Sequence, residues 1–264
     1  ALRCVYCAPE IRGDVVIKNF AVFVYALLCY AIGLGGLVAF ILYQGDLLLP
    51  RTINTPADAA FVMALAINAG LILLWSIQHS LMARPAFKQG LARMLPESAE
   101  RSTYVLASGV CLLLIVHFWQ GSTATVWHVA DLETPLRIVS LLGWGITVWA
   151  TFEIDHFDLF GVKQPFCNLF GREYRERDFV TPFLYSRIRH PIQTGVLIGM
   201  WPQALMTEGQ LILTLLMTVY IFLGLYFEEK DLVRRFGERY LSYMQQVPRL
   251  FPSPGKRAER DTQS

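Results

Sequence analysis

The stretch FAVFVYALLCYAIGLGGLVAFILY, residues 20–43, contains no Asp, Glu, Lys or Arg. A helix that crosses a bilayer needs about 20 predominantly apolar residues, so this stretch alone predicts a membrane protein. Because more such stretches follow, we expect an all-α polytopic integral membrane protein with five to six transmembrane helices, the last two forming a helical hairpin. The further apolar runs occupy residues 59–83, 102–130 and 137–157, and two shorter ones occupy residues 192–207 and 209–227.

The composition of the whole chain excludes other classes of protein. Of the 264 residues, 54% are hydrophobic and 17% are charged, whereas soluble domains carry about 25% charged residues. This deficit excludes a soluble globular enzyme and a disordered protein, and the net charge of +2 is too small for a nucleic-acid-binding surface. The lipid bilayer is therefore the expected partner, and no obligatory protein partner is evident. Cys4 and Cys7 lack the further ligands of a four-ligand set, so we expect no metal.

Lys and Arg are distributed unevenly between the apolar runs. Three precede the first run, four follow the second, six follow the fourth and eight follow the last, whereas the three intervening connections carry one, none and none. Cytoplasmic segments are enriched in these residues, so six crossings with both chain ends in the cytoplasm are predicted. A five-span protein would need one run to be re-entrant, in the last pair. Polar residues near the span ends then gather at the cytoplasmic face, where we expect a pocket.

The chain is expected to form a single domain over residues 1–264. It would comprise an N-terminal cytoplasmic segment (1–19), membrane helices (20–227), an amphipathic helix (228–247) and a disordered tail (248–264). The amphipathic helix is predicted because an apolar face recurs at helical spacing opposite three arginines. The apolar face comprises Leu232, Phe236, Tyr240, Met244 and Val247.

The strongest chemical signal is RHPIQTG, residues 189–195, followed after one apolar hairpin by EEKDL, residues 228–232. Pro191 suits the first turn of a helix, whose free N–H groups can bind a carboxylate together with Arg189. His190 can hydrogen-bond a polar ligand group, and the adjacent glutamates can bind a ribose diol, an amino group and a cation. S-adenosylmethionine carries all of these groups. Alternatively, the arginine and one glutamate form an ion pair that only fixes the hairpin.

Five segments, in this order, resemble the bacterial methanethiol S-methyltransferases: WSIQHSLMARPAFK (75–88), PESAERSTYVL (96–106), IDHFDLFGVKQ (154–164), RHPIQTG (189–195) and FEEKDLVRRFGERY (227–240). The two last motifs are also similar to those of the wider group that includes isoprenylcysteine carboxyl methyltransferase and NnrU, although that group usually has Tyr in place of Gln193. The resemblance implies an enzyme of the bacterial inner membrane, with its active site facing the cytoplasm. It would methylate methanethiol with S-adenosylmethionine, giving dimethyl sulfide. The implied cofactor-binding residues are Tyr185, Arg189, His190, Gln193, Gly195, Glu228 and Glu229.

The methyl acceptor has to be a thiolate, because the neutral thiol is a poor nucleophile. His79 and His156 are the candidate bases, and Asp155 can orient or tune one of them. Tyr104 and Arg101 can stabilise the thiolate by a hydrogen bond or by charge. Each also has a structural interpretation: His79 as a polar residue at a helix end, and the Asp-His pair as partners of a nearby arginine that tie the loops together.

Three other functions remain open from the sequence. A related methyltransferase could act on another acceptor, such as a lipid amine or a carboxylate. A membrane reductase using NADPH is an alternative because sterol reductases share the C-terminal region of the superfamily. An NnrU-like accessory protein would need neither a cofactor nor the residues His190 and Glu228.

Overall fold

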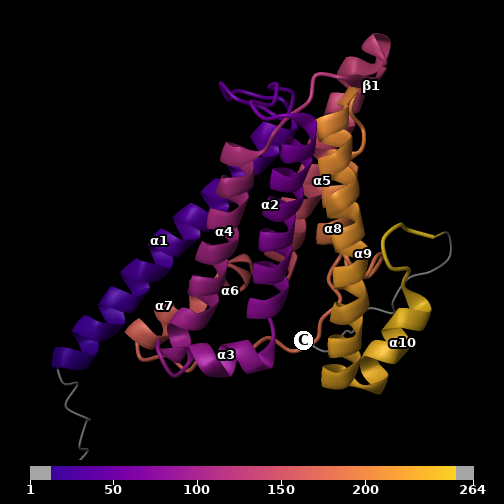
Figure 1. Ribbon diagram of the computed structural model, residues 1–264. Helices are drawn as coiled ribbons and strands as arrows, with labels where there is room; N and C mark the ends of the chain where they lie inside the picture. Colours follow the sequence, from indigo (N-terminus) through magenta and orange to yellow (C-terminus); the bar gives the residue numbers. More distant parts are fainter. Residues whose placement is uncertain (1–12, 254–264) are drawn as a thin grey trace, which may run out of the picture.

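A computed structural model describes residues 13–253, and it is almost entirely helical over that range (Figure 1). Five helices are long and apolar enough to cross a membrane, which confirms the predicted polytopic fold. These helices are α1 (Gly13–Gln44), α2 (Phe61–Met82), α4 (Glu100–Phe118), α5 (Glu133–Glu153) and α9 (Glu208–Phe236). Shorter elements are α3 (Pro85–Leu91), α6 (His156–Leu159), α7 (Lys163–Leu169), α8 (Pro191–Met200), α10 (Glu238–Gln246) and the strands β1 (Thr125–His128) and β2 (Leu205–Thr207).

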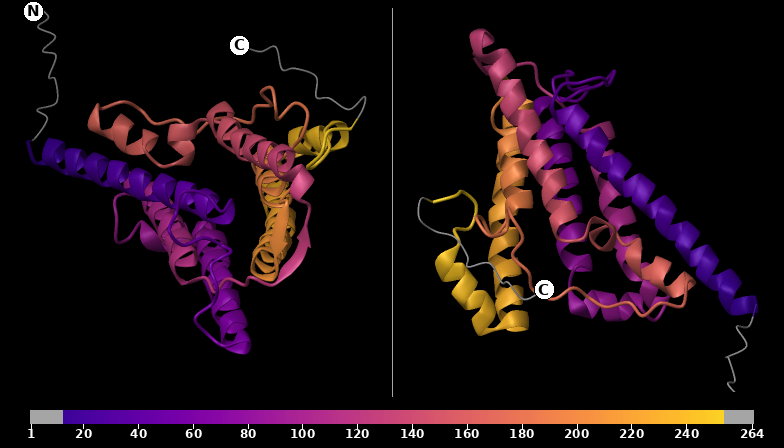
Figure 2. Two further views of the ribbon diagram at one scale, coloured as in Figure 1. Left: turned by 90° about the horizontal axis from the view of Figure 1, so that it is seen from above. Right: turned by 180° about the vertical axis from the view of Figure 1, so that it is seen from behind.

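The long helices form two layers (Figure 2). In the N-terminal layer α4 packs against both α1 and α2, and in the C-terminal layer α5 packs along α8, which lies beside α9. The two strands pair at one end of the bundle, which we call the strand end, and α3, α6, α7 and α10 lie at the other, which we call the basic end (Figure 1). An apolar cluster that includes Phe40, Trp119, Trp144 and Leu213 joins the layers.

Residues 191–207 make one more passage along the bundle, although α8 has only 10 residues. The passage starts where His190 Nε2 lies 3.1 Å from Glu229 Oε1, and it ends where β2 pairs with β1 at the strand end. Between Glu208 and Glu229 a helix rises about 31 Å, so the passage is helical over about half of that length and extended over the rest. The predicted hairpin is therefore present, but its first arm is only partly helical.

Pro202 explains why α8 ends at Met200. Proline has no N–H to donate, and its ring clashes with the carbonyl four residues before it, so a regular helix does not continue through Pro202. Carbonyl groups left unpaired at membrane depth are costly, and side chains of the other helices take the place of the missing bonds. Ser140 Oγ donates to the carbonyl of Gly199 at 2.5 Å, and Gln44 Nε2 donates to that of Met200 at 3.3 Å.

Glycines allow α5 and α8 to pack with their backbones in contact. A Cβ atom at Gly143 would lie 2.4 Å from the backbone nitrogen of Gly199, and one at Gly195 would lie 2.6 Å from the carbonyl oxygen of Gly143. Both distances are far shorter than a van der Waals contact. The spacing of Gly195 and Gly199 therefore serves helix packing, as is common for small residues four apart in apolar helices.

The boundary predicted between residues 227 and 228 is wrong. α9 continues to Phe236, and the chain bends only at Gly237, whose φ of +57° lies in a region that glycine adopts readily. α10 follows, and its apolar face packs on the protein itself: Tyr240 and Tyr243 are buried against Phe179. The predicted amphipathic face is therefore present, but it is largely covered by the chain.

Two further boundaries differ from the sequence-based expectation. α1 begins at Gly13, so residues 13–19 continue the first helix instead of preceding it. The tail predicted from residue 248 is ordered at its start, because the backbone N–H groups of Arg189 and His190 donate to the carbonyls of Pro248 and Arg249. Residues 1–12, with Cys4 and Cys7, and residues 254–264 lie outside the described range.

Candidate active site

Glu229 is the centre of an ion-pair cluster at the basic end of α9. Its Oε1 atom accepts from Arg189 Nε at 2.9 Å and lies 3.1 Å from His190 Nε2, while Oε2 accepts from Arg249. The Glu229 side chain is only 4% exposed. We call Arg189, His190, Glu229 and Arg249 the Glu229 hub. A buried carboxylate needs this number of partners to offset its loss of hydration.

Arg189 is fully engaged within this hub. In addition to its bonds with Glu229, its Nη1 atom donates to the carbonyls of Met244 and Val247, each at 2.8 Å. These carbonyls lie at and just after the C-terminal end of α10, where a cation is favoured. The arginine thus forms the ion pair that was the structural alternative from the sequence, and its predicted pairing with a ligand carboxylate would have to break these bonds.

Glu228 differs from its neighbour because its side chain is 47% exposed. Its Oε2 atom lies 4.0 Å from His190 Nδ1 and accepts from Gln193 Nε2 at 3.5 Å. Tyr185 is close enough that the Glu228 charge, added to burial, raises the pKa of its phenol. Glu228, Gln193 and the Nδ1 edge of His190 therefore lie together, and Glu228 is the more exposed of the two glutamates.

Gly195 is the predicted cofactor residue that the structure places elsewhere. It faces α5, where a Cβ atom would lie 2.4 Å from Thr147 Oγ1 and 2.6 Å from the carbonyl oxygen of Gly143. Close helix packing accounts for this glycine, so a contact with the cofactor is not needed to explain it.

His79 and Tyr104 form the second cluster, between α2 and α4. The Tyr104 hydroxyl lies 2.9 Å from His79 Nε2 and 3.0 Å from Nδ1, and Ser108 Oγ lies 3.3 Å from Nδ1. The Trp75 indole stacks on the imidazole with ring centroids 5.0 Å apart. The guanidinium of Arg101 lies 6.0 Å from the centre of the Tyr104 ring, and its Nε donates to the carbonyl of Leu159.

Tyr220 on α9 joins this cluster to the cofactor motif. Its ring contacts those of Trp75 and His79, with centroids 4.7 and 6.2 Å away, and its hydroxyl lies 3.2 Å from Ser80 Oγ. Glu228 lies eight residues further along the same helix, a rise of about 12 Å. The predicted acceptor residues on α2 and α4 therefore contact the helix that carries Glu228 and Glu229.

Asp155 and His156 lie in a separate environment. His156 is 5% exposed, and its two ring nitrogens lie 3.0 Å from the Tyr30 hydroxyl and 2.8 Å from Thr151 Oγ1. Burial lowers the pKa of His156, and the Asp155 charge only partly opposes this. Burial acts to raise the pKa of Asp155, but the hydrogen bond from Lys163 Nζ at 2.5 Å, the backbone N–H of Asp158 and the charges of Lys163 and Arg177 together lower it.

These contacts bear on the roles predicted for Asp155 and His156. Asp155 pairs with Lys163 and not with an arginine, and it shifts the pKa of His156 without bonding to the imidazole. His79 contacts Tyr104, Ser108, Trp75 and Tyr220, all of them outside the loop that holds Asp155.

In residues 13–253, no group of three or more His, Cys, Asp or Glu side chains is arranged to hold a metal ion.

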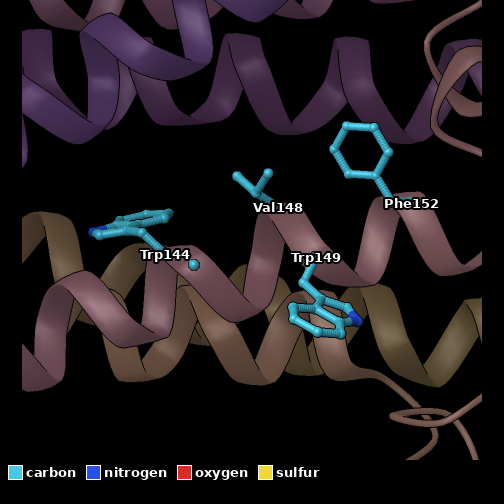
Figure 3. Close-up of a pocket in the computed structure, with 5 residues that line it drawn as sticks. Trp144, Val148, Trp149 and Phe152 are labelled. Atoms are coloured by element: carbon cyan, nitrogen blue, oxygen red, sulfur yellow. The ribbon is translucent and has the colours of Figure 1, made fainter.

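A hollow lies along α5 and not at either cluster. It has a volume of about 630 Å³ and is lined by Trp144, Gly145, Val148, Trp149 and Phe152, of which Val148 and Phe152 point to the same side of the helix (Figure 3). None of these side chains can transfer a proton. This apolar groove suits a lipid chain or an apolar solute, and it adjoins His156, on which the Phe152 ring stacks with a centroid distance of 4.2 Å.

Sequence reasoning missed Tyr220, Ser80 and Arg249. A tyrosine within the apolar run of α9 was the available signal for Tyr220, because a polar tip at membrane depth needs a partner. For Ser80, the available signal was its position directly after His79 in the chain. Arg249 stands between two prolines in a segment with the composition of a disordered tail, so its pairing with Glu229 had no local signal.

The fold and the paired motifs define a polytopic membrane methyltransferase. The phospholipid methyltransferase family matches residues 137–239, a range that contains most of α5, all of α8 and α9, and every residue of the Glu229 hub except Arg249. More specifically, the chain belongs to the methanethiol S-methyltransferase family, and the predicted enzyme class is confirmed.

Relatives in this family match almost the whole chain. Identity is 39% over 235 residues to methanethiol S-methyltransferase 2 of Bradyrhizobium diazoefficiens, covering 89% of this chain and 91% of that protein. It is 40% over 248 residues to the methanethiol S-methyltransferase of Pseudomonas deceptionensis, covering 93% and 95%. The corresponding enzyme of Crocosphaera subtropica is 37% identical over 239 residues, covering 90% and 94%. No solved structure matches the chain.

Proposed function

We propose that this protein transfers a methyl group from S-adenosylmethionine to methanethiol, giving dimethyl sulfide and S-adenosylhomocysteine. The observation that carries the proposal is the contact of His79 and Trp75 with Tyr220 on α9, the helix that also carries Glu228. The names of the relatives support the acceptor. The exposed carboxylate of Glu228 suits a cationic methyl donor, because an opposite charge favours binding at a partly buried site.

His79 would accept the thiol proton. A neutral imidazole has one nitrogen that can accept a proton, and the hydroxyls of Tyr104 and Ser108 lie next to its two nitrogens. Tyr104 can then donate a hydrogen bond to the thiolate, with Arg101 nearby as the positive charge. The thiolate sulfur forms a bond to the methyl carbon as the carbon–sulfonium bond breaks, and its electron pair stays on S-adenosylhomocysteine. The proton remains on His79 until it passes to solvent.

The site would face the cytoplasm, the compartment from which S-adenosylmethionine arrives. The candidate residues lie at the basic end, together with most of the described Lys and Arg residues of the loops. The excess of these residues in cytoplasmic segments supports this orientation. The bacterial inner membrane is the matching location.

The decisive assay uses the purified chain in detergent with methanethiol and S-adenosylmethionine. We expect dimethyl sulfide in the headspace and an equal amount of S-adenosylhomocysteine in solution. No methylated product from methanethiol, in a preparation that binds S-adenosylhomocysteine, would reject this acceptor.

A second candidate is methylation of a lipid amine at the same site. The match to the phospholipid methyltransferase family and the apolar groove along α5 favour it. An acceptor panel that includes phosphatidylethanolamine and longer alkyl thiols separates the two. We expect methanethiol to have the highest kcat/KM and phosphatidylethanolamine to yield no product.

A further inference from the structure

The two adjacent glutamates of the cofactor motif are in different environments. Glu229 is 4% exposed and bonds to Arg189, His190 and Arg249, whereas Glu228 is 47% exposed and approaches the other edge of the His190 ring. A ligand can reach Glu228 without breaking an ion pair. Reaching Glu229 would leave two guanidinium groups without their carboxylate, which is costly for partly buried charges.

The bonds of the hub determine how His190 can meet a ligand. A carboxylate only accepts hydrogen bonds, so His190 Nε2, 3.1 Å from Glu229 Oε1, has to be the N–H donor. The charges of Arg189 and Arg249 balance those of Glu228 and Glu229 when the imidazole is neutral. In a neutral imidazole with the proton on Nε2, Nδ1 is an acceptor.

Arg249 supplies one of the two positive charges in this balance and anchors its segment. Its own carbonyl accepts from the His190 backbone N–H at 3.1 Å, and the carbonyl of Leu250 accepts from Thr194 Oγ1 at 2.6 Å. Residues 248–250 are thereby bound to the start of α8. Without Arg249 the hub would carry a net negative charge together with Glu228, and Glu229 Oε2 would lose its partner.

We propose that Arg249 is a positioning residue of the methyl-donor site, and that with Glu229 it holds His190 so that Nδ1 and Glu228 together bind the donor's ammonium group. This inference rests on the proposed function, because it assumes that S-adenosylmethionine is the donor. His190 Nδ1 and the Glu228 carboxylate both accept hydrogen bonds, so together they select a group rich in N–H donors and repel a carboxylate. Arg249 acts through Glu229 and His190 and does not touch the ligand itself.

The test compares two ligands by calorimetry on the purified full chain: S-adenosylhomocysteine and its analogue without the α-amino group. In the unmodified protein we expect the amino group to improve affinity about tenfold, as for a hydrogen bond to a charged group. In Glu228→Gln and in Arg249→Gln this ratio should fall towards one, and Arg249→Lys should restore part of it. A purely structural role would weaken both ligands equally and leave the ratio unchanged.

Arg235→Gln is the matched control, because Arg235 also forms a half-exposed ion pair at the basic end, with Glu176 at 2.8 Å. It should keep the full ratio. If Arg249→Gln does not fold, Glu229→Gln carries the test, since its amide can donate to Nε2 and so turn Nδ1 into the N–H. An unchanged ratio in either variant overturns the inference. Failure of the unmodified protein to bind S-adenosylhomocysteine would instead reject the proposed function.

Discussion

Two histidines at the basic end, the half-buried His79 and the buried His156, have similar immediate contacts but lie against different helices. Both stack on an aromatic ring, Trp75 in one case and Phe152 in the other, and both have a hydroxyl near each ring nitrogen. The ring of His79, however, also contacts Tyr220 of α9, the helix that carries Glu228. His156 is surrounded by Tyr30, Phe157 and Phe160.

The comparison teaches that burial and hydrogen bonding alone do not distinguish a base from a structural histidine. The two histidines differ in which helix lies against them. His79 lies next to the helix that carries the cofactor motif, whereas His156 joins α6 to α1 through Tyr30. We therefore assign proton transfer to His79 and packing of the loop to His156, and the following experiments can break this assignment.

The largest effect is expected for His79→Gln, which removes the proposed base. A positioned general base contributes about 10²–10⁴-fold to a rate, so kcat/KM for methanethiol should fall within that range. Affinity for S-adenosylhomocysteine should change less than threefold, about the margin of a lost weak contact. An undiminished kcat/KM would exclude His79 as the base.

Tyr104→Phe should have the next largest effect, because it removes one hydroxyl and leaves the ring in place. One hydrogen bond to a charged group corresponds to about tenfold in rate, and we expect a loss of that size in kcat with little change in the KM for S-adenosylmethionine. Ser108→Ala, which removes the second hydroxyl near His79 Nδ1, is the comparison variant. A greater loss in Ser108→Ala than in Tyr104→Phe would contradict the role proposed for Tyr104.

His156→Leu should affect stability and not catalysis. It leaves the Tyr30 hydroxyl and Thr151 Oγ1 without their partner, which costs about 1–3 kcal/mol of unfolding free energy. The melting temperature should fall. The kcat per folded molecule should stay within twofold, which is about the size of effect that a surface substitution has. A loss of kcat comparable to that of His79→Gln would show that the wrong histidine was chosen.

The same variant tests a pH dependence. The pKa of His156 is lowered in the folded protein, so the unfolded state takes up a proton first as the pH falls. Stability from the neutral imidazole is therefore complete above the usual histidine pKa and declines as the pH falls below it towards the folded value. Melting between pH 8 and 5 should show this decline in the unmodified protein and a flatter profile in His156→Leu. Equal slopes would mean that another group titrates.

The smallest effect is expected for Asp155→Asn. Its ion pair with Lys163 is partly exposed, and such pairs contribute about 1 kcal/mol or less. A slight fall in the melting temperature at neutral pH, with unchanged kcat, is expected. A large fall in kcat would restore Asp155 to the catalytic site.

The membrane fold was predictable because hydrophobic length is a local property. Residues 20–43 lie within α1 and residues 209–227 within α9, and the runs at 59–83, 102–130 and 137–157 overlap α2, α4 and α5. The distribution of Lys and Arg predicts six crossings, and five helices are long and apolar enough to make one. The partly helical fifth passage was harder to predict, because the replacement of the carbonyl partners at Gly199 and Met200 depends on side chains from α5 and α1.

The site was predictable where chemistry resides in one motif. His190, Gln193, Glu228 and Tyr185 lie together, as their motifs imply. The separation of His156 from His79 depends on tertiary packing, and so does the pairing of Arg249 with Glu229. Neither follows from helical spacing or composition.

An experimental structure with S-adenosylhomocysteine bound tests the central claim most directly. We predict that its amino group lies within hydrogen-bond distance of Glu228 and that its sulfur faces His79 and Tyr104. A sulfur that faces His156 and the apolar groove along α5 would contradict the assignment.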